Sequence, residues 1–380
     1  MKKTLLCLLL VLLLAAASLV SVSAADLELA APSAILMDAA TGTVIYEANA
    51  HERLRPASVT KIMTLLLTME AIDSGALSYD DAVTGSTHAA SMGGSQIWLK
   101  EGEQMSVRDL LKAVCIVSGN DAAVALGEHI AGSEDAFVER MNRRAQELGM
   151  NDTHFVNCTG LPADGHLTSA YDIAVMSREL LLNHPDIRQF TTIWMDSLRG
   201  GESMLVNTNK LIRFYDGATG LKTGSTDTAK NCLSASAERN GMELIAVVLK
   251  APTSTDRFED AKALLNYGFS NYALVTVTPE AALTPLPVRL GERAFVQPVL
   301  TKENRLLLDK ARSVNLTQTL DLPESVDAPV CEGDPLGELV ITDADGVTVA
   351  SLPILAGESV GHVTWWQMLQ RYLAVAFGAA

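Results

Sequence analysis

Residues 55–64 read Arg-Pro-Ala-Ser-Val-Thr-Lys-Ile-Met-Thr, and the interpretation of the whole chain starts from this stretch. After Pro56, apolar side chains recur at helical spacing, and Pro56 and Gly75 are well placed to begin and end a helix. Ser58 and Lys61 are three residues apart, so a helix places a hydroxyl and an amine on one face. The stretch therefore predicts a helix that carries a nucleophile beside a base.

Two further short runs follow in a fixed order. Ser118-Gly119-Asn120 supplies a second hydroxyl beside an amide, and Lys222-Thr223-Gly224 supplies a cation on a segment that ends in glycine. Singly, each run also fits an ordinary helix surface, a cap or a strand end. Together and in this order, the three runs indicate a serine enzyme that transfers acyl groups.

The serine needs a neighbouring base that is unprotonated at neutral pH. An isolated lysine has a pKa near about 10.4, and a second ammonium about 4 Å away lowers it by roughly three units. Burial lowers the pKa further. We therefore expect Lys61 to be the proton acceptor and Lys222 to be the second charge. Ser118 is expected to pass the proton to the leaving amine, with Asn120 orienting the substrate amide and the Lys61 amine.

The third run also suggests how a substrate binds. Lys222 can receive a substrate carboxylate, and Thr223 adds a hydroxyl to that contact. Gly224 allows a peptide to pair closely along the edge of this strand. The backbone N–H groups of Ser58 and Ser225 are the expected donors to an oxyanion.

The surrounding pattern predicts an α+β fold. Alternating apolar residues flank Thr41-Gly42, and Asn240-Gly241 joins two apolar runs, so both places predict hairpins. Capping residues Ser106, Ser133 and Ser169 predict helices between them. A further helix is expected over about 256–267. Strands at both ends that enclose helices indicate a mixed, largely antiparallel sheet with a helical subdomain inserted.

From about residue 275 the pattern of apolar and turn-forming residues changes. Short apolar segments broken by Pro, Gly and Asp, with a hairpin around Asp345-Gly346, predict a small β-rich domain. Residues 364–377 form an amphipathic pattern about 20 Å long as a helix, too short to span the roughly 30 Å hydrocarbon core. Such a helix fits a membrane surface, although docking on its own protein is the alternative.

The N-terminus has the features of a secretory signal, because Lys2-Lys3 precede an apolar run and Ser23-Ala24-Ala25. A retained N-terminal anchor is the alternative, and either form exports the chain. The predicted parts are a signal peptide (1–25), a catalytic domain (26–272), a β-rich domain (273–360) and a membrane-associating helix (361–380).

The amino-acid composition limits the classes of partner and cofactor that the protein can bind. The chain has 45 acidic and 29 basic residues and a formal charge of −16, which argues against nucleic acid as a partner. Its seven histidines show no metal-ligand spacing, so we expect neither a metal nor another cofactor. Four cysteines lie outside the signal and allow three pairings, although buried free thiols are the preferred reading. They are Cys115, Cys158, Cys232 and Cys331.

These runs resemble the penicillin-binding D-alanyl-D-alanine carboxypeptidases. Residues 55–64 are similar to the nucleophile segment of that family and 216–224 to its third motif, and three short stretches between them are similar to its downstream signature. The resemblance implies a β-lactamase/transpeptidase-like catalytic domain and no cofactor. It also implies peptidoglycan stem peptides as substrate, β-lactams as covalent inhibitors, and a location on the outer face of the bacterial cytoplasmic membrane. The downstream stretches are His154-Phe155-Val156-Asn157, Thr159-Gly160-Leu161 and Asp164-Gly165-His166.

Carried over by position, the resemblance implies Ser58 as acyl-ester nucleophile, Lys61 as proton acceptor, Ser118 as an active-site hydroxyl and Lys222 in substrate binding. The chain departs from many relatives at Ser225, where they carry histidine. Two other functions stay open. One is a serine β-lactamase, although no Glu lies between Glu147 and Glu179 to activate a deacylating water. The other is a protein that binds cell-wall peptide or penicillin without hydrolysing it.

Overall fold

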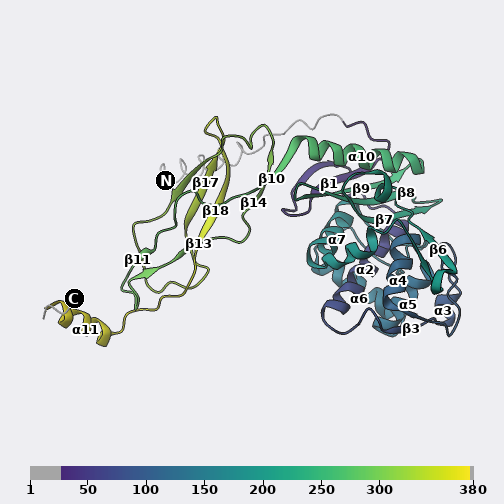
Figure 1. Ribbon diagram of the computed structural model, residues 1–380, viewed down its shortest axis with the longest axis horizontal. Coiled ribbons are helices and arrows are strands. Elements are labelled where there is room, and N and C mark those ends of the chain that lie inside the picture. The colour runs from purple at the N-terminus through teal and green to yellow at the C-terminus, as the bar shows by residue number, and fades with distance from the viewer. Residues whose placement is uncertain (1–26, 377–380) are drawn as a thin grey trace, which may run out of the picture.

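The computed structural model describes residues 27–376 (Figure 1). A five-stranded sheet forms the centre of the larger part, in the order β2-β1-β9-β8-β7. Every neighbouring pair in this sheet is antiparallel. Its strands are β1 (Ser33–Asp38), β2 (Val44–Ala48), β7 (Ala218–Thr226), β8 (Lys230–Arg239) and β9 (Met242–Ala251).

The sheet separates two hydrophobic cores because successive side chains of a strand point to opposite faces. On β1, Ile35 and Met37 belong to the core shared with the helical subdomain, whereas Ala34 and Leu36 belong to the core under α10. Figure 1 shows α10 on one face of the sheet and α2 and α7 on the other. The predicted α+β architecture with an inserted helical subdomain is confirmed.

Local sequence signals explain where the elements begin and turn. The hydroxyls of Ser106, Ser133 and Ser169 each accept a hydrogen bond from the backbone N–H three residues later, as predicted for N-caps. Asn240 and Gly241 have φ of 52° and 77°, which a tight hairpin turn between β8 and β9 requires.

The helical subdomain and its margins contain short and long elements. Their bounds are η1 (Ala57–Thr60), α2 (Lys61–Asp73), α3 (Thr87–Ala90), α4 (Val107–Lys112), η2 (Ala113–Val117), α5 (Asn120–Ala131), α6 (Glu134–Glu147), α7 (Ala170–Asn183), η3 (Pro185–Ile187), α8 (Arg188–Thr191), η4 (Arg199–Gly201) and α9 (Leu211–Phe214). Two small hairpins pair β3 (Ala82–Thr84) with β4 (Gln104–Ser106) and β5 (Met195–Leu198) with β6 (Ser203–Val206).

The helix predicted over about 256–267 is longer than expected. It is α10 (Ser254–Asn271), which begins at a capping box formed by Thr253 and Asp256. The predicted range began two residues late and ended four residues early. Strand β10 (Tyr272–Thr276) follows directly and leads into the second part of the chain.

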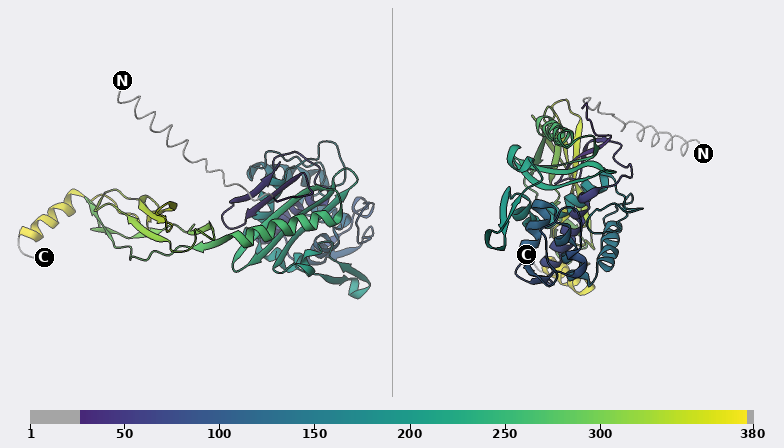
Figure 2. Two further views of the ribbon diagram at one scale, coloured as in Figure 1. Left: turned by 90° about the horizontal axis from the view of Figure 1, so that it is seen from above. Right: turned by 90° about the vertical axis from the view of Figure 1, so that its right-hand side faces the viewer.

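Residues 272–356 form small sheets around two modest hydrophobic cores. The predicted hairpin around Asp345-Gly346 is present between β17 and β18. Figure 2 shows this β-rich part between the larger part and the C-terminal helix. The domain limits given above stay a prediction. The remaining strands are β11 (Leu286–Arg289), β12 (Phe295–Val296), β13 (Pro298–Leu300), β14 (Arg305–Asp309), β15 (Thr317–Asp321), β16 (Val326–Asp327), β17 (Pro335–Thr342) and β18 (Thr348–Ala356).

The C-terminal helix α11 (Trp365–Ala376) exposes its aromatic side chains, with Trp365 75% and Tyr372 73% accessible. Its polar face contacts the β-rich part, because the Arg371 guanidinium donates to the carbonyl oxygens of Gly291 and Glu292. Among residues 27–376, no helix combines the length and apolar character needed to cross a membrane. The predicted signal peptide and Phe377 lie outside the described residues.

All four cysteines of the described chain are free thiols. Cys115, Cys158 and Cys232 are buried, in line with the preferred reading. Cys331 is exposed, so the expectation of burial was wrong for this residue.

Candidate active site

The nucleophile segment begins with a short 3-10 helix instead of a regular α-helix. Ser58 lies in η1, and Lys61 is the first residue of α2. Because residues three apart eclipse one another in a 3-10 helix, this geometry aligns the two side chains closely. The Lys61 Nζ lies 3.1 Å from the Ser58 Oγ.

The Lys61 amine is fully buried and has three neighbours. Besides Ser58, it lies 2.6 Å from the Asn120 Oδ1 and 2.8 Å from the Thr159 carbonyl oxygen. A neutral amine has two hydrogens and one lone pair. Donation to Asn120 and Thr159 uses both hydrogens, so the lone pair is left for the Ser58 hydroxyl.

Burial holds the pKa of Lys61 well below its usual value, and the charge of Lys222 lowers it further. The order of these causes differs from our expectation, which gave the second ammonium first place. Desolvation is larger because the side chain has no exposed surface. Lys222 nevertheless lowers the pKa of Lys61, as expected of a second ammonium near the base.

Ser118 and Asn120 lie where a π-helical segment gives way to α5. η2 ends at Val117, and its C-cap, Ser118, has a left-handed backbone with φ 64° and ψ 33°. The Ser118 Oγ is buried and has no hydrogen-bond partner among the described residues. Asn120 is held by its backbone N–H, which donates to Ser95, and by its Nδ2, which donates to the Gly93 carbonyl at 2.6 Å.

Strand β7 forms the opposite side of the site. Lys222 is buried, and desolvation lowers its pKa to about 7, with Cys115 opposing the shift and Arg257 adding to it. Its ammonium donates to the Thr223 carbonyl at 2.9 Å. The Thr223 Oγ1 lies 2.8 Å from the Thr208 Oγ1.

Gly224 brings β7 against the nucleophile segment. A Cβ at this position would lie 2.9 Å from the Ser58 backbone nitrogen and 2.8 Å from the Pro56 carbonyl oxygen. Only glycine therefore permits this approach. Ser225, the next residue, has an exposed side chain 3.4 Å from the Asn231 Oδ1. The structure thus brings Lys61 and Gly224 against Ser58, and Asn120 against Lys61.

Sequence reasoning missed several groups that shape the site. Thr159 contributes a backbone oxygen, which no side-chain pattern reveals. A Cβ on Gly160 would lie 1.8 Å from the Ala57 carbonyl oxygen. The Asn157 Oδ1 fixes this turn by accepting from the backbone N–H groups of Thr159 and Gly160.

Arg257 was also missed, although it sits behind the third motif. Its guanidinium is largely buried and donates to the carbonyl oxygens of Gly224 and Cys232. It adds a positive charge close to Lys222, as the lowered pKa of Lys222 shows. Its helix was expected only as an approximate range, and no local pattern predicts a contact with a carbonyl oxygen 33 residues away.

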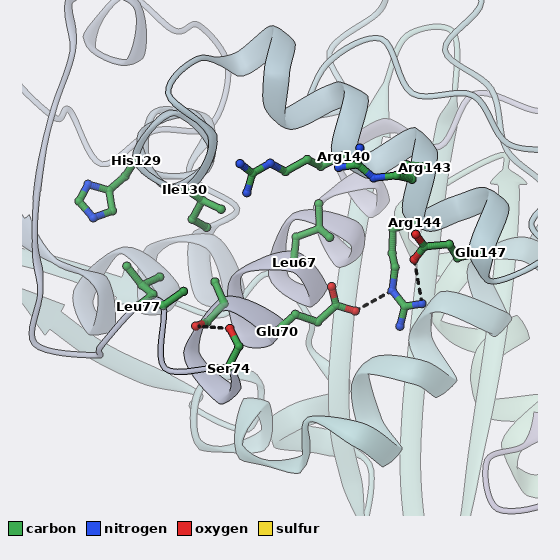
Figure 3. A pocket seen from close by; sticks show the side chains of 12 residues that line it. Leu67, Glu70, Ser74, Leu77, His129, Ile130, Arg140, Arg143, Arg144 and Glu147 are labelled. Atoms are coloured by element: carbon green, nitrogen blue, oxygen red, sulfur yellow. Dashed lines mark hydrogen bonds and ion pairs between the residues drawn. The ribbon is translucent and has the colours of Figure 1, made fainter.

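A separate cavity of about 490 Å³ lies at the far end of α2 and is lined by residues outside the three motifs (Figure 3). Arg144 binds Glu70 at 2.7 Å beside this cavity and also Glu179 at 2.6 Å. Glu70 and Glu179 form, with His184, a possible metal-ligand cluster in the described chain. The Arg144 guanidinium already forms ion pairs with both carboxylates.

A serine beside a buried lysine, a second hydroxyl and a lysine-bearing strand define a serine enzyme of acyl transfer. Residues 20–253 match the family model of D-alanyl-D-alanine carboxypeptidases, peptidase family S11. The chain therefore belongs to the D-alanyl-D-alanine carboxypeptidase family, which confirms the expected resemblance, fold class and enzyme class.

Relatives and solved structures agree with this assignment. The chain is 42% identical to the D-alanyl-D-alanine carboxypeptidase DacF of Bacillus subtilis, over 90% of this chain and 88% of the relative. Penicillin binding protein 5 from Haemophilus influenzae has a similar structure, with a TM-score of 0.81 and 29% identity over 90% of this chain and all of that one. Penicillin-Binding Protein D2 from Listeria monocytogenes, solved in its ampicillin-bound form, has a TM-score of 0.59 and 34% identity over 64% of this chain and all of that one.

Proposed function

We propose that the enzyme removes the terminal D-alanine from peptidoglycan stem peptides through an ester on Ser58. The Ser58 Oγ attacks the carbonyl carbon of the penultimate residue, and the bond from that carbon to the nitrogen of the terminal D-alanine breaks. Water then hydrolyses the ester and releases the shortened peptide. The observation that carries this proposal is the buried Lys61 amine 3.1 Å from the Ser58 Oγ.

Lys61 takes the proton of Ser58 as the ester forms. Its lowered pKa keeps the amine neutral at the start, and its contacts with Asn120 and Thr159 hold the lone pair in position. Ser118 then passes the proton to the departing amine. The absence of a protein partner for the Ser118 hydroxyl within the described chain supports this role, because its bonds are free for substrate.

Positive charge selects a substrate that ends in a free carboxylate. Lys222 and the Thr223 hydroxyl bind this group, and Arg257 strengthens the local potential from behind Gly224. The oxyanion of the tetrahedral intermediate accepts hydrogen bonds from the N–H groups of Ser58 and Ser225. The closeness of Gly224 to the Ser58 nitrogen supports this pairing.

β-Lactams are proposed to acylate the same serine. Ampicillin occupies the similar Listeria monocytogenes protein, and a penicillin carries both an acyl group and a carboxylate. No described carboxylate contacts the Lys61 amine or the Ser58 hydroxyl, so the ester is expected to be long-lived. This expectation separates the enzyme from a β-lactamase.

The enzyme is also proposed to act outside the cytoplasm at the membrane surface. The predicted signal supports export, and the exposed aromatic side chains of α11 support insertion of this helix into the interface. The β-rich part between α11 and the catalytic part is proposed to hold the active site away from the lipid (Figure 2).

A comparison of the native protein with Ser58→Ala tests the catalytic proposal. Mass spectrometry is expected to show a stable penicillin adduct on the native peptide that contains Ser58 and loss of one alanine from a peptide ending in D-Ala-D-Ala. Both signals should vanish in the variant, whereas Ser74→Ala at the end of α2 should retain them. Adduct formation in Ser58→Ala, or rapid release of hydrolysed penicillin by the native enzyme, would refute the proposal.

A further inference from the structure

His166 is a buried histidine that the catalytic proposal leaves without a role. Its ring bridges two segments that are distant in sequence. The Val156 backbone N–H lies 3.0 Å from the Nδ1, and the Thr60 Oγ1 lies 2.8 Å from the Nε2. The ring also packs edge-on against Phe155, with centroids 5.8 Å apart.

These contacts determine which ring nitrogen carries the proton. A backbone N–H only donates, so the Nδ1 of His166 accepts from Val156 and is unprotonated. Burial lowers the pKa of His166 to about 4, with a smaller effect of His154, so the ring is neutral at neutral pH. The single ring proton is therefore on the Nε2 and points to the Thr60 hydroxyl.

The Thr60 hydroxyl extends this chain to the nucleophile. Because its oxygen accepts from His166, its own proton is free for the Ala57 carbonyl oxygen, which lies 2.9 Å away. Ala57 has a left-handed backbone with φ 50°, a conformation that costs a non-glycine residue of order 1 kcal/mol or more. Such a conformation persists only where its surroundings hold it.

The Ala57 carbonyl and the Ser58 N–H belong to one planar peptide group. A contact that fixes the direction of the carbonyl therefore fixes the direction of the N–H. Gly160 packs against the same carbonyl, and Gly224 lies beside the Ser58 nitrogen. The orientation of this peptide thus depends on the turn at Gly160, on β7 at Gly224 and on the Thr60 hydroxyl.

We propose that His166, acting through Thr60, is a positioning residue that orients the Ser58 N–H toward the oxyanion. The chain runs from the Val156 N–H to His166, from His166 to Thr60, and from Thr60 to the Ala57 carbonyl. This inference rests on the proposed role of Ser58 as nucleophile. No proton is transferred along the chain during the reaction.

Substitutions that remove or retain individual hydrogen bonds of this chain test the role of His166. In His166→Asn the side-chain oxygen still accepts from Val156, but no donor reaches Thr60, whereas the His166→Gln amide donates at the position of the Nε2. Thr60→Val removes the hydroxyl and keeps the shape of the side chain, whereas Thr60→Ser keeps the hydroxyl. We expect acylation of Ser58 by penicillin to slow about ten- to a hundredfold in His166→Asn and Thr60→Val. His166→Gln and Thr60→Ser should recover most of the rate.

His154→Gln is the matched control, because His154 lies on the same loop but is exposed. It should acylate at the native rate. Melting temperatures identify any variant that fails to fold, and the noncovalent affinity for penicillin should stay within about threefold of native, since the chain acts on the oxyanion formed later. Native acylation rates in both folded His166→Asn and folded Thr60→Val would overturn the proposal.

Nitrogen NMR of the native protein labelled in histidine tests the chain without substitution. The His166 ring should remain the neutral tautomer protonated at the Nε2 between about pH 5 and 8, as its pKa of about 4 requires. A proton on the Nδ1 would contradict the proposal. If native Ser58 forms no adduct, the catalytic role of Ser58 fails, while this spectrum still reports separately on the hydrogen bonds.

Discussion

The two buried lysines have different tasks in the proposed mechanism, although both have lowered pKa values. Lys61 has two acceptors for its hydrogens and Ser58 for its lone pair, which suits a base. Lys222 has a pKa of about 7, so the substrate carboxylate proposed to bind there would favour return of its proton. The proposal therefore needs one amine to stay neutral while the other becomes charged.

Asn120→Asp tests the importance of a neutral Lys61. The new carboxylate would replace an oxygen 2.6 Å from the amine and favour its charged form. A carboxylate at this distance raises the pKa of a lysine by about one to three units. Acylation at pH 7 should fall by about ten- to a thousandfold and recover as the pH rises.

Stopped-flow acylation rates from pH 6 to 10 provide the measurement. Asn266→Asp makes the same charge change on the exposed side of α10 and should leave the profile unchanged. An Asn120→Asp profile that falls in parallel with the native one at every pH would show that the lysine pKa does not control the rate.

Lys222→Met is expected to stabilise the protein while impairing substrate binding. The pKa of Lys222 is depressed to about 7 in the folded state, and the unfolded value is about 10.4, so the native protein gains stability as the pH rises between them. Below about pH 7 the folded state carries the full cost of the buried charge. Methionine removes this cost, and we expect a gain of about 1–4 kcal/mol at pH 6 that shrinks toward pH 10.

Urea unfolding of the native protein and the variant at both pH values measures this difference. Lys210→Met changes an exposed lysine and should shift the free energy of unfolding by less than about 0.5 kcal/mol. A Lys222→Met protein that is less stable than native at pH 6 would show that the ammonium is compensated in the free enzyme.

Secondary-structure elements meet at the nucleophile through glycines. β7 approaches η1 at Gly224, and the turn at Gly160 closes over the Ala57–Ser58 peptide. The contacts are backbone to backbone, so a side chain at either position has no flexible neighbour to displace. The precision of the site therefore depends on residues without any chemistry of their own.

Gly160→Ala should displace the nucleophile segment, because the new Cβ would lie 1.8 Å from the Ala57 carbonyl oxygen. We expect a loss of about 2–4 kcal/mol in stability and a fall in acylation of at least about a hundredfold. Gly165→Ala is the matched control. Its φ of +80° is close to the +82° of Gly160, but its new Cβ would meet only His154, at 4.0 Å.

Melting temperatures and acylation rates of the two variants distinguish the effect of backbone strain from that of a steric clash with the nucleophile segment. Gly165→Ala should lose about 1–2 kcal/mol and keep its acylation rate. Equal effects of the two substitutions would mean that left-handed strain, and not contact with the nucleophile segment, explains the requirement for glycine.

Much of the fold was predictable because its signals are local. The Asn240-Gly241 hairpin and the N-caps at Ser106, Ser133 and Ser169 each depend on a few neighbouring residues, and each is present. The motifs also predicted that Lys61 would lie beside Ser58 and Asn120 beside Lys61.

The features of the fold and the site that were not predicted depend on information that no local sequence pattern contains. The π-helical segment η2 has no sequence signal of its own, so the left-handed Ser118 was not foreseen. The Thr159 carbonyl is a backbone group, and the contact of Arg257 with Gly224 spans 33 residues. The larger effect of desolvation on Lys61 required knowledge of its complete burial.

The whole molecule is elongated, with the catalytic part at one end and α11 at the other (Figure 2). The single cationic side chain described on α11, Arg371, is engaged with the carbonyl oxygens of Gly291 and Glu292. Attachment to a membrane would therefore depend on apolar burial more than on attraction to anionic lipid.

Removal of residues 364–380 should abolish binding to lipid vesicles and leave acylation by penicillin unchanged. Flotation with neutral and anionic vesicles measures this, and the intact exported protein should bind both to within about threefold. The triple variant Trp365→Ser, Trp366→Ser and Tyr372→Ser should weaken vesicle binding by the full-length chain. Unchanged flotation of the truncated protein would exclude α11 as the attachment.

Titration of the Lys61 amine in the folded protein decides the catalytic mechanism most directly. Nitrogen NMR of lysine-labelled enzyme, assigned by comparison with Lys61→Arg, gives the protonation state at each pH. The amine is expected to lose its proton well below pH 10.5 and to be neutral where acylation is fast. If the Lys61 amine instead remains an ammonium at every pH where acylation is fast, Lys61 is not the base.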